Sequence, residues 1–147
     1  MSTNTATRSR LAAAVPQFSV SDVLATVHYY RDRLGFAVGD LVADPPEWGA
    51  VGRDDVELFF NRLPPGASSQ PRIRALGAYD AYFRVSGVDQ LAAEFRERGA
   101  VIREGPTNRV YDVREVVIED LNGLVLAFGE PTGSGATQKG GLGAAAG

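Results

Sequence analysis

The chain has 147 residues, with 15 basic and 18 acidic side chains and a formal net charge of −3 at pH 7. Its 44% hydrophobic and 22% charged content is typical of a globular domain. The charge balance argues against a nucleic-acid partner, and no apolar run is long enough to cross a membrane, so we expect a cytoplasmic protein. Cysteine is absent, which excludes disulfides and thiol chemistry, and the single histidine, His28, restricts imidazole-based catalysis and metal binding.

The two ends and one internal segment have compositions that do not favour a packed core. Residues 1–10 are polar, residues 131–147 are rich in glycine and alanine, and residues 64–77 are rich in proline, glycine and serine. These compositions predict a disordered leader, a flexible tail and a linker. The expected organisation is a leader at 1–10, a first unit at 11–63, the linker at 64–77, a second unit at 78–130 and the tail at 131–147.

An internal repeat decides the expected architecture. The segment Phe18-Ser-Val-Ser-Asp-Val23 recurs as Phe83-Arg-Val-Ser-Gly-Val88, and Tyr30-Arg-Asp-Arg33 recurs as Phe95-Arg-Glu-Arg98. Each copy has the pattern of an alternating strand, a helix, a glycine and then further strands. The sequence therefore predicts an α+β protein built from two βαβββ repeats.

The start and stop signals of the helices set the boundaries within each copy. In the first copy, the helix is predicted to start from an N-cap at Ser21, with Asp22 beside it, and to end at Leu34 before a left-handed cap at Gly35. Its strands are predicted at 15–20, 36–42, 47–53 and 56–63. The second copy is predicted to hold a helix at 88–98, a loop at 105–110, a turn at 120–123, and strands at 78–86, 101–104, 111–119 and 124–129.

Four short motifs carry a resemblance to a known family. They are Ala14-Val-Pro16, Tyr29-Tyr-Arg-Asp-Arg-Leu-Gly-Phe36, Gly52-Arg-Asp-Asp-Val-Glu-Leu-Phe59 and Asp120-Leu-Asn-Gly123. With the repeat, they resemble the vicinal-oxygen-chelate superfamily of glyoxalases, bleomycin-resistance proteins and dioxygenases, and the first half is most similar to bleomycin-resistance proteins. The resemblance spans residues 13 to 130. It implies curved mixed sheets whose concave face forms a ligand cleft.

The resemblance also implies where a metal would bind in family members that use one. Those positions correspond here to Val15, Glu57, Asp80 and Ala127. Valine and alanine have no donor atom, and a catalytic divalent ion usually needs about three protein ligands. His28 falls on the helix, on the other side of the sheet. We therefore expect no metal and no cofactor.

Strand alternation predicts which side chains share the face of these positions. On the fourth and fifth strands they include Glu57 and Phe59, and Asp80, Tyr82 and Arg84; Glu115 is expected to join them. The alternative is that the aromatic side chains are core residues and the charges pair with one another, Asp80 with Arg84 among them. The candidate ligand-binding residues are Trp48, Glu57, Phe59, Asp80, Tyr82, Arg84, Tyr111 and Glu115.

Two functions follow from this set. Acids among aromatic walls favour a cationic, flat, partly aromatic guest, so the first is metal-independent sequestration of an antibiotic-like small molecule. The second is an enzyme of the same superfamily, a lyase, isomerase or oxygenase, with Glu57 as one possible proton-transfer group. Either way we expect a small-molecule ligand and a homodimer, because the sheets of a single chain would leave edges exposed.

Overall fold

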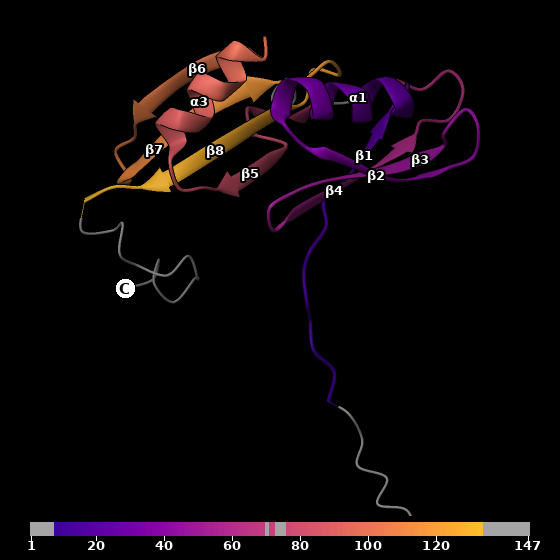
Figure 1. The fold of residues 1–147 in the computed structure, drawn as a ribbon, viewed down its shortest axis with the longest axis horizontal. Coiled ribbons are helices and arrows are strands. Elements are labelled where there is room, and N and C mark those ends of the chain that lie inside the picture. The colour runs from indigo at the N-terminus through magenta and orange to yellow at the C-terminus, as the bar shows by residue number, and fades with distance from the viewer. Residues whose placement is uncertain (1–7, 70, 73–75, 134–147) are drawn as a thin grey trace, which may run out of the picture.

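The computed structural model describes residues 8–69, 71–72 and 76–133. The chain forms two four-stranded mixed sheets, each with one helix against one face (Figure 1). The strand orders are β1-β4-β3-β2 and β5-β8-β7-β6, and the first strand of each unit lies parallel to the last. The elements are β1 Gln17–Val20, α1 Val23–Leu34, β2 Ala37–Val42, β3 Trp48–Arg53, β4 Val56–Arg62, β5 Ala81–Arg84, α3 Val88–Glu97, β6 Val101–Asn108, β7 Val113–Glu119 and β8 Val125–Pro131. The predicted α+β fold of two βαβββ repeats is confirmed.

The ends of α1 follow from local hydrogen bonding. The N-cap is Asp22, whose carboxylate accepts the Ala25 N–H at 2.9 Å, so the predicted cap at Ser21 is wrong by one residue. A carboxylate also stabilises the positive end of the helix dipole better than a hydroxyl does. Gly35 ends the helix with φ +73°, as predicted, and its N–H donates to Tyr30 O.

The second unit differs from its prediction at β6. This strand continues through Gly105 and Pro106 to Asn108, where a loop was expected. Its pairing with β7 shifts register between Glu104 and Thr107, which gives the Gly-Pro pair a bulge. β6 is also an edge strand, where a missing proline N–H costs no ladder hydrogen bond. The predicted start of the next strand is two residues too early, since Tyr111 lies in the β6–β7 turn and β7 begins at Val113.

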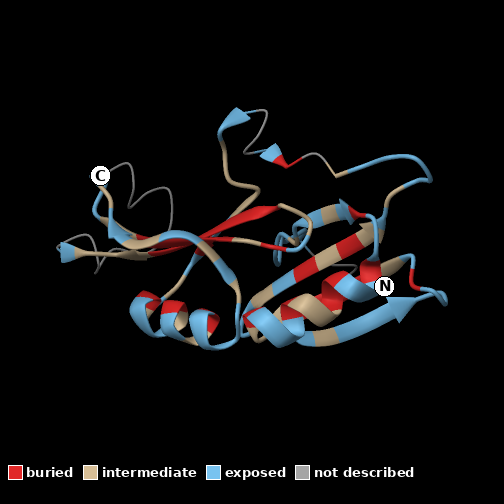
Figure 2. Ribbon diagram, turned by 90° about the horizontal axis from the view of Figure 1, so that it is seen from above, coloured by how far each residue is buried: buried red, intermediate tan, exposed pale blue. Residues whose placement is uncertain are grey.

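One continuous core joins the two units. It holds buried side chains from α1, β3 and β4 together with others from α3, β7 and β8, and it includes the aromatic residues Tyr30, Phe60, Phe95 and Phe128. Figure 2 shows these buried positions along the sheets and on the helix faces turned toward them. Burial alternates strictly on β4, where Leu58 and Phe60 are inaccessible and their neighbours are not.

The helix of each unit also contacts a hairpin turn of the other. Tyr30 of α1 donates its hydroxyl proton to the buried carboxylate of Asp120, in the β7–β8 turn, at 2.7 Å. Glu94 of α3 binds Arg53, beside the β3–β4 turn, through two hydrogen bonds of 2.8 and 2.9 Å. These contacts fix the two sheets relative to each other and therefore position the faces that the helices leave uncovered.

The predicted outer segments fall at the limits of the described chain. Residues 8–10 have no regular structure and are exposed, while residues 1–7 lie outside the described part. β8 ends at Pro131, the first residue of the predicted tail, and Thr132 N–H still donates to Asp112 O; residues 134–147 are not described. No helix within the described ranges is long and apolar enough to cross a membrane.

Candidate ligand-binding site

Each sheet has one face against its helix and one face without a helix, here called the open face. On β1, Phe18 packs against the core, whereas Gln17 and Ser19 are exposed on the open face. On β4, Phe59 lies between the buried Leu58 and Phe60 and therefore points to the open face. The alternation predicted from the sequence therefore assigns these side chains to the same faces of the sheet as the structure shows.

The open face of the first sheet carries an aromatic pair. Trp48 on β3 and Phe59 on β4 have ring centroids 4.8 Å apart and an interplanar angle of 55°, and both are half-buried. Beside them, Asn61 accepts hydrogen bonds from Gln17 and Ser19, each 3.1 Å long. The open face of the first sheet thus has an apolar platform, formed by Trp48 and Phe59, next to a group of hydrogen-bonded polar side chains.

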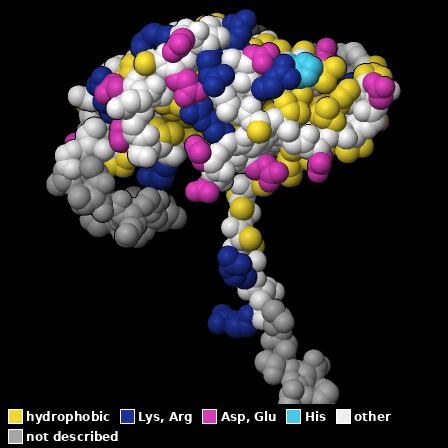
Figure 3. Space-filling model, in the orientation of Figure 1, with side chains coloured by type: hydrophobic (Ala, Val, Ile, Leu, Met, Phe, Trp, Pro, Cys, Tyr) yellow, Lys and Arg dark blue, Asp and Glu magenta, His cyan; other side chains and the backbone are white. Residues whose placement is uncertain are grey.

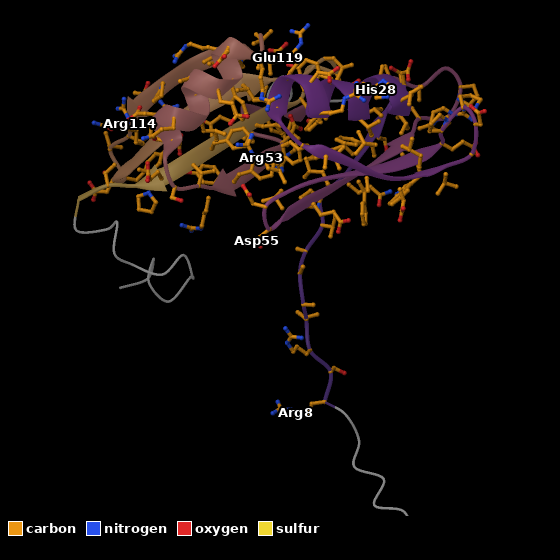
Figure 4. The ribbon with its side chains drawn as sticks, viewed as in Figure 1. Arg8, His28, Arg53, Asp55, Arg114 and Glu119 are labelled. Carbon is orange, nitrogen blue, oxygen red and sulfur yellow. The ribbon has the colours of Figure 1, made fainter. Side chains whose placement is uncertain are left out.

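Glu57 lies on the same face of β4 as Phe59, two residues before it. Its side chain is exposed and forms no hydrogen bond or ion pair with any other described residue. Glu57 is therefore a carboxylate available to a ligand beside the aromatic pair. His28 lies on α1 (Figure 4), which covers the opposite face of this sheet.

The open face of the second sheet is organised around Glu115 on β7. This carboxylate is fully buried and accepts three hydrogen bonds. Tyr82 and Tyr111 donate their hydroxyl protons to Oε2 at 2.8 and 2.9 Å, and Arg109 donates from Nε to Oε1 at 3.0 Å. The structure thus brings together three of the predicted residues, Tyr82, Tyr111 and Glu115.

Arg109 and Tyr79 belong to this cluster but were not predicted. Arg109 also donates to Glu104 at 2.9 Å and to Tyr79 Oη at 3.4 Å. Tyr79 packs over the small apolar side chains of Val117, Val125 and Ala127. Arg109 was missed because it was assigned to a loop; extending the strand pairing through the Gly-Pro pair would have placed it near Glu115.

The hydrogen bonds around Glu115 make this cluster a fixed one. Burial, followed by the hydrogen bond and the negative charge of Glu115, raises the pKa of Tyr82 well above its ordinary value, and the same causes raise the pKa of Tyr111. Hydrogen bonds to Glu104 and Glu115 raise the pKa of Arg109 further. Both phenols therefore stay protonated, while Tyr82 and Tyr111 as whole residues remain 45% and 55% exposed, respectively.

Gly129 on β8 allows Tyr82 to reach Glu115. Tyr82 lies on β5 and Glu115 on β7, so the tyrosine must cross β8, and Glu115 pairs with Gly129 in the ladder. A Cβ at Gly129 would lie 1.9 Å from Tyr82 Oη and 2.8 Å from Val113 Cγ1. No residue with a side chain fits there without moving Tyr82.

Asp80 and Arg84 lie apart from this cluster and form no ion pair with each other. The two oxygens of Asp80 accept backbone N–H groups, from Val125 at 2.9 Å and from Arg72 at 3.0 Å. Arg84 lines a hollow at the boundary between the two units. The predicted pairing of Asp80 with Arg84 is thus not found.

The positions that the family resemblance assigns to metal ligands do not fit a divalent ion. Val15 and Ala127 offer no donor atom, and the oxygens of Asp80 are engaged by backbone N–H groups. Only Glu57 remains. Across residues 8–69, 71–72 and 76–133, no three His, Cys, Asp or Glu side chains lie close enough together to hold an ion.

Several solved structures share this fold. A glyoxalase/bleomycin resistance protein/dioxygenase from Nocardioides is 17% identical, with a TM-score of 0.66 over 92% of this chain and 93% of that one. TioX from Micromonospora sp. ML1 is 16% identical, with a TM-score of 0.64 over 80% and 97% of the two chains. The bleomycin-binding protein from Streptomyces verticillus, solved with copper(II)-bleomycin, is 22% identical, with a TM-score of 0.61 over 86% and 100%.

Comparison with curated protein sequences yields no significant match. The family model for the glyoxalase/bleomycin resistance protein/dioxygenase superfamily matches residues 12–128, which include both βαβββ units. The repeat, the two mixed sheets and this match agree, and the chain belongs to that superfamily.

Proposed function

We propose that this protein binds a small, flat, cationic aromatic compound on the open faces of its sheets and sequesters it without chemical conversion. The observation that carries the proposal is the burial and hydrogen bonding of Glu115. This carboxylate is inaccessible to solvent, and two tyrosines and an arginine occupy three of its roughly four acceptor positions, so it is not exposed to a substrate. Its role is to hold aromatic rings in place, as a preformed binding surface requires.

The ring systems of both sheets support a stacking ligand. Trp48 and Phe59 form one apolar platform, and Tyr82 and Tyr111 form another whose hydroxyl groups are held. Rings with few rotatable bonds lose little entropy when a ligand stacks on them. Glu57, exposed beside the first platform, gives a preference for positive charge through attraction and cation–π contact.

The relatives support the same class of guest. Two structures in the fold comparison are bleomycin-binding proteins, one solved with bleomycin and the other with copper(II)-bleomycin. For this chain a bleomycin-type compound is therefore the first ligand to test. The enzyme alternative depends on Glu57, which is the exposed carboxylate of the set and could transfer a proton.

We also propose a homodimer. The open faces expose aromatic side chains in a single chain, and a second copy would cover them while leaving a cleft between the copies. Sedimentation or light scattering at micromolar concentration should give twice the mass of the chain. A monomer under these conditions would contradict this part of the proposal and leave ligand binding on a single open face to be tested separately.

Trp48 is the single tryptophan of the chain, so its fluorescence reports on the first platform. Titration with metal-free bleomycin should change this fluorescence saturably, and calorimetry should give the same affinity. Glu57→Gln is expected to weaken binding about tenfold, or roughly 1.4 kcal/mol. Glu97→Gln removes the same charge from an exposed position on α3 and serves as the matched control.

Two results would decide against sequestration. The first is the absence of binding by bleomycin and by a panel of cationic aromatic dyes. The second is turnover of an oxo- or hydroxy-acid that is abolished in Glu57→Gln, which would establish the enzyme alternative.

A further inference from the structure

The hollow that Arg84 lines lies where the two units differ in the length of an equivalent hairpin turn. The β7–β8 turn spans five residues between Glu119 and Val125, and it packs on α1: besides the Tyr30–Asp120 bond, Asn122 donates to Thr26 Oγ1 at 3.1 Å. The β3–β4 turn consists of Asp54 and Asp55 only. This shorter turn does not reach across α3, and a hollow of about 560 Å³ remains between it, α3 and the end of β5.

The floor of this hollow is apolar and comes from both units. Phenylalanine side chains from the core line it together with aliphatic residues; the apolar lining residues include Phe36, Val56, Phe83, Leu91, Phe95 and Phe128. Their contacts with one another fix the floor, since Phe128 stacks on Phe83 at 4.8 Å and meets Phe95 edge-on at 5.2 Å. The volume of the hollow, about 560 Å³, lies within the range of about 300–1,000 Å³ that is typical of small-molecule sites.

One wall of the hollow presents hydrogen-bond donors without partners. Arg84 at the end of β5, Ser86 after it and Gln90 on α3 all line the hollow. None of the three side chains forms a hydrogen bond or ion pair with another residue in the described ranges. Arg84 is exposed and adds a positive charge that no neighbouring carboxylate within those ranges balances.

The opposite wall carries the acidic groups, and two of its charges are already balanced. Glu94 is bound by Arg53 and by Arg98, both at 2.8 Å, and Asp54 lies 3.9 Å from Arg53 Nε. The third acid, Asp55 at the tip of the hairpin (Figure 4), also lines the hollow and forms no ion pair with another described residue. The unpaired positive charge of Arg84 therefore lies on the wall formed by β5 and α3, and the unpaired negative charge of Asp55 lies on the opposite wall. Elsewhere, the face in Figure 3 shows acidic and basic side chains interspersed.

We propose that this hollow is a second ligand site, separate from the open faces, which binds a monocarboxylate with an apolar body. The carboxylate would accept from the Arg84 guanidinium, with Ser86 and Gln90 as further donors, and the apolar part would lie on the phenylalanine floor. Arg84 is suited to this role because its guanidinium can bind both oxygens of a carboxylate at once. The site uses no residue of the Glu115 cluster.

Decanoate, below its micellar concentration, is a suitable probe, and decan-1-ol is its uncharged counterpart. Calorimetry should show one decanoate bound per chain. Arg84→Gln should weaken decanoate at least tenfold and change decan-1-ol by less than twofold. Arg8→Gln removes a charge from the extended segment far from the hollow (Figure 4) and should leave decanoate unchanged.

Gln90→Trp fills the hollow from an exposed helix position and should abolish binding of both compounds while circular dichroism stays that of the wild type. The proposal is overturned if decanoate shows no saturable binding, or if its affinity is the same in Arg84→Gln and in Gln90→Trp as in the wild type. It is equally overturned if bleomycin competes with decanoate, because the two sites would then be one.

Discussion

The two units present equivalent positions to each other at the junction, yet they fill them differently. At the helix ends the equivalence holds: Arg33 of the first unit donates to Gly99 O at 2.7 Å, and Arg98 of the second donates to Asp32 O at 3.4 Å. At the hairpin turns it fails, because Asp120 is buried with a tyrosine whereas Arg53 forms a partly exposed ion pair with Glu94. The contact between the two units is therefore buried at the Asp120 turn, the sealed junction, and partly exposed at the Arg53–Glu94 ion pair, the open junction.

The open faces differ in the same way. The first sheet has an aromatic pair and a carboxylate without a partner among the described residues, whereas the second has aromatic rings hydrogen-bonded to a buried carboxylate. The repeat therefore preserves the direction in which side chains point. The hydrogen-bond partners of each side chain decide whether it is held rigidly or is available to a ligand.

Removing Asp120 should have the largest effect, because its carboxylate accepts from Tyr30 and from the N–H groups of Asn122 and Leu124 at 2.8 and 2.9 Å. Asp120→Ala leaves these donors buried without an acceptor and should cost about 3 kcal/mol of the free energy of unfolding, measured in urea. Tyr30→Phe removes one donor and keeps the ring, so about 1 kcal/mol is expected. Equal costs for the two variants would contradict a sealed junction centred on Asp120.

Gly129→Ala tests the rigid platform of the second sheet. The added methyl group displaces Tyr82, so the Tyr82–Glu115 bond is lost, at a cost of about 1–2 kcal/mol in unfolding free energy. Bleomycin affinity should fall as well. In the first sheet, Gly52→Ala meets only Val56 O at 3.6 Å and should be neutral within about 0.5 kcal/mol. A Gly129→Ala variant that keeps both stability and affinity would show that the position of Tyr82 is unimportant.

Glu94→Gln tests the open junction. The ion pairs of Glu94 with Arg53 and Arg98 are partly exposed, so the variant should lose about 1 kcal/mol of the free energy of unfolding at pH 7. Arg53, followed by Arg98, lowers the pKa of Glu94 despite an opposing contribution from burial. The stabilisation is therefore complete above the ordinary glutamate pKa of about 4.3 and is lost as the pH falls through the lowered pKa of the folded state.

The difference between the wild type and Glu94→Gln should accordingly shrink when unfolding is measured at progressively lower pH. Glu97→Gln, on the same helix and exposed, should show little difference at any pH. A difference that persists undiminished at low pH would mean that Glu94 acts through packing and not through charge.

The smallest effect is expected at the helix ends. Arg33→Gln loses an exposed hydrogen bond to Gly99 O and a cation–π contact of 6.0 Å with the Tyr29 ring, and should cost about 0.5 kcal/mol of the free energy of unfolding. Its counterpart Arg98→Gln also loses the bond to Glu94, so it should cost about 1 kcal/mol. If Arg33→Gln lowered the free energy of unfolding more than Arg98→Gln, the expectation that Arg98 contributes more through its bond to Glu94 would be wrong.

The repeat, the order of the elements and the faces of the strands could be predicted from the residues alone. These features rest on local signals: period-two alternation placed Phe59 and Tyr82 opposite the core, and Gly35 ended the helix where a left-handed conformation is needed. The first half of β6 was predicted as a strand at 101–104, but its continuation through residues 105–108 was not, because a Gly-Pro pair normally indicates a loop. The position of β6 at the sheet edge makes this pair tolerable.

Which side chains have hydrogen-bond or ion-pair partners depends on how the strands and the two units pack together. Arg109 meets Glu115 through a hairpin, Tyr82 reaches it across Gly129, and Asp80 turns to the backbone N–H groups of Val125 and Arg72. Alternation along a strand fixes the direction of a side chain but carries no information about hydrogen bonds to other strands. Arg84 was correctly predicted to lie on a strand, but the hollow beside it exists because one hairpin turn is shorter than its counterpart. That difference matters only where the two units pack together.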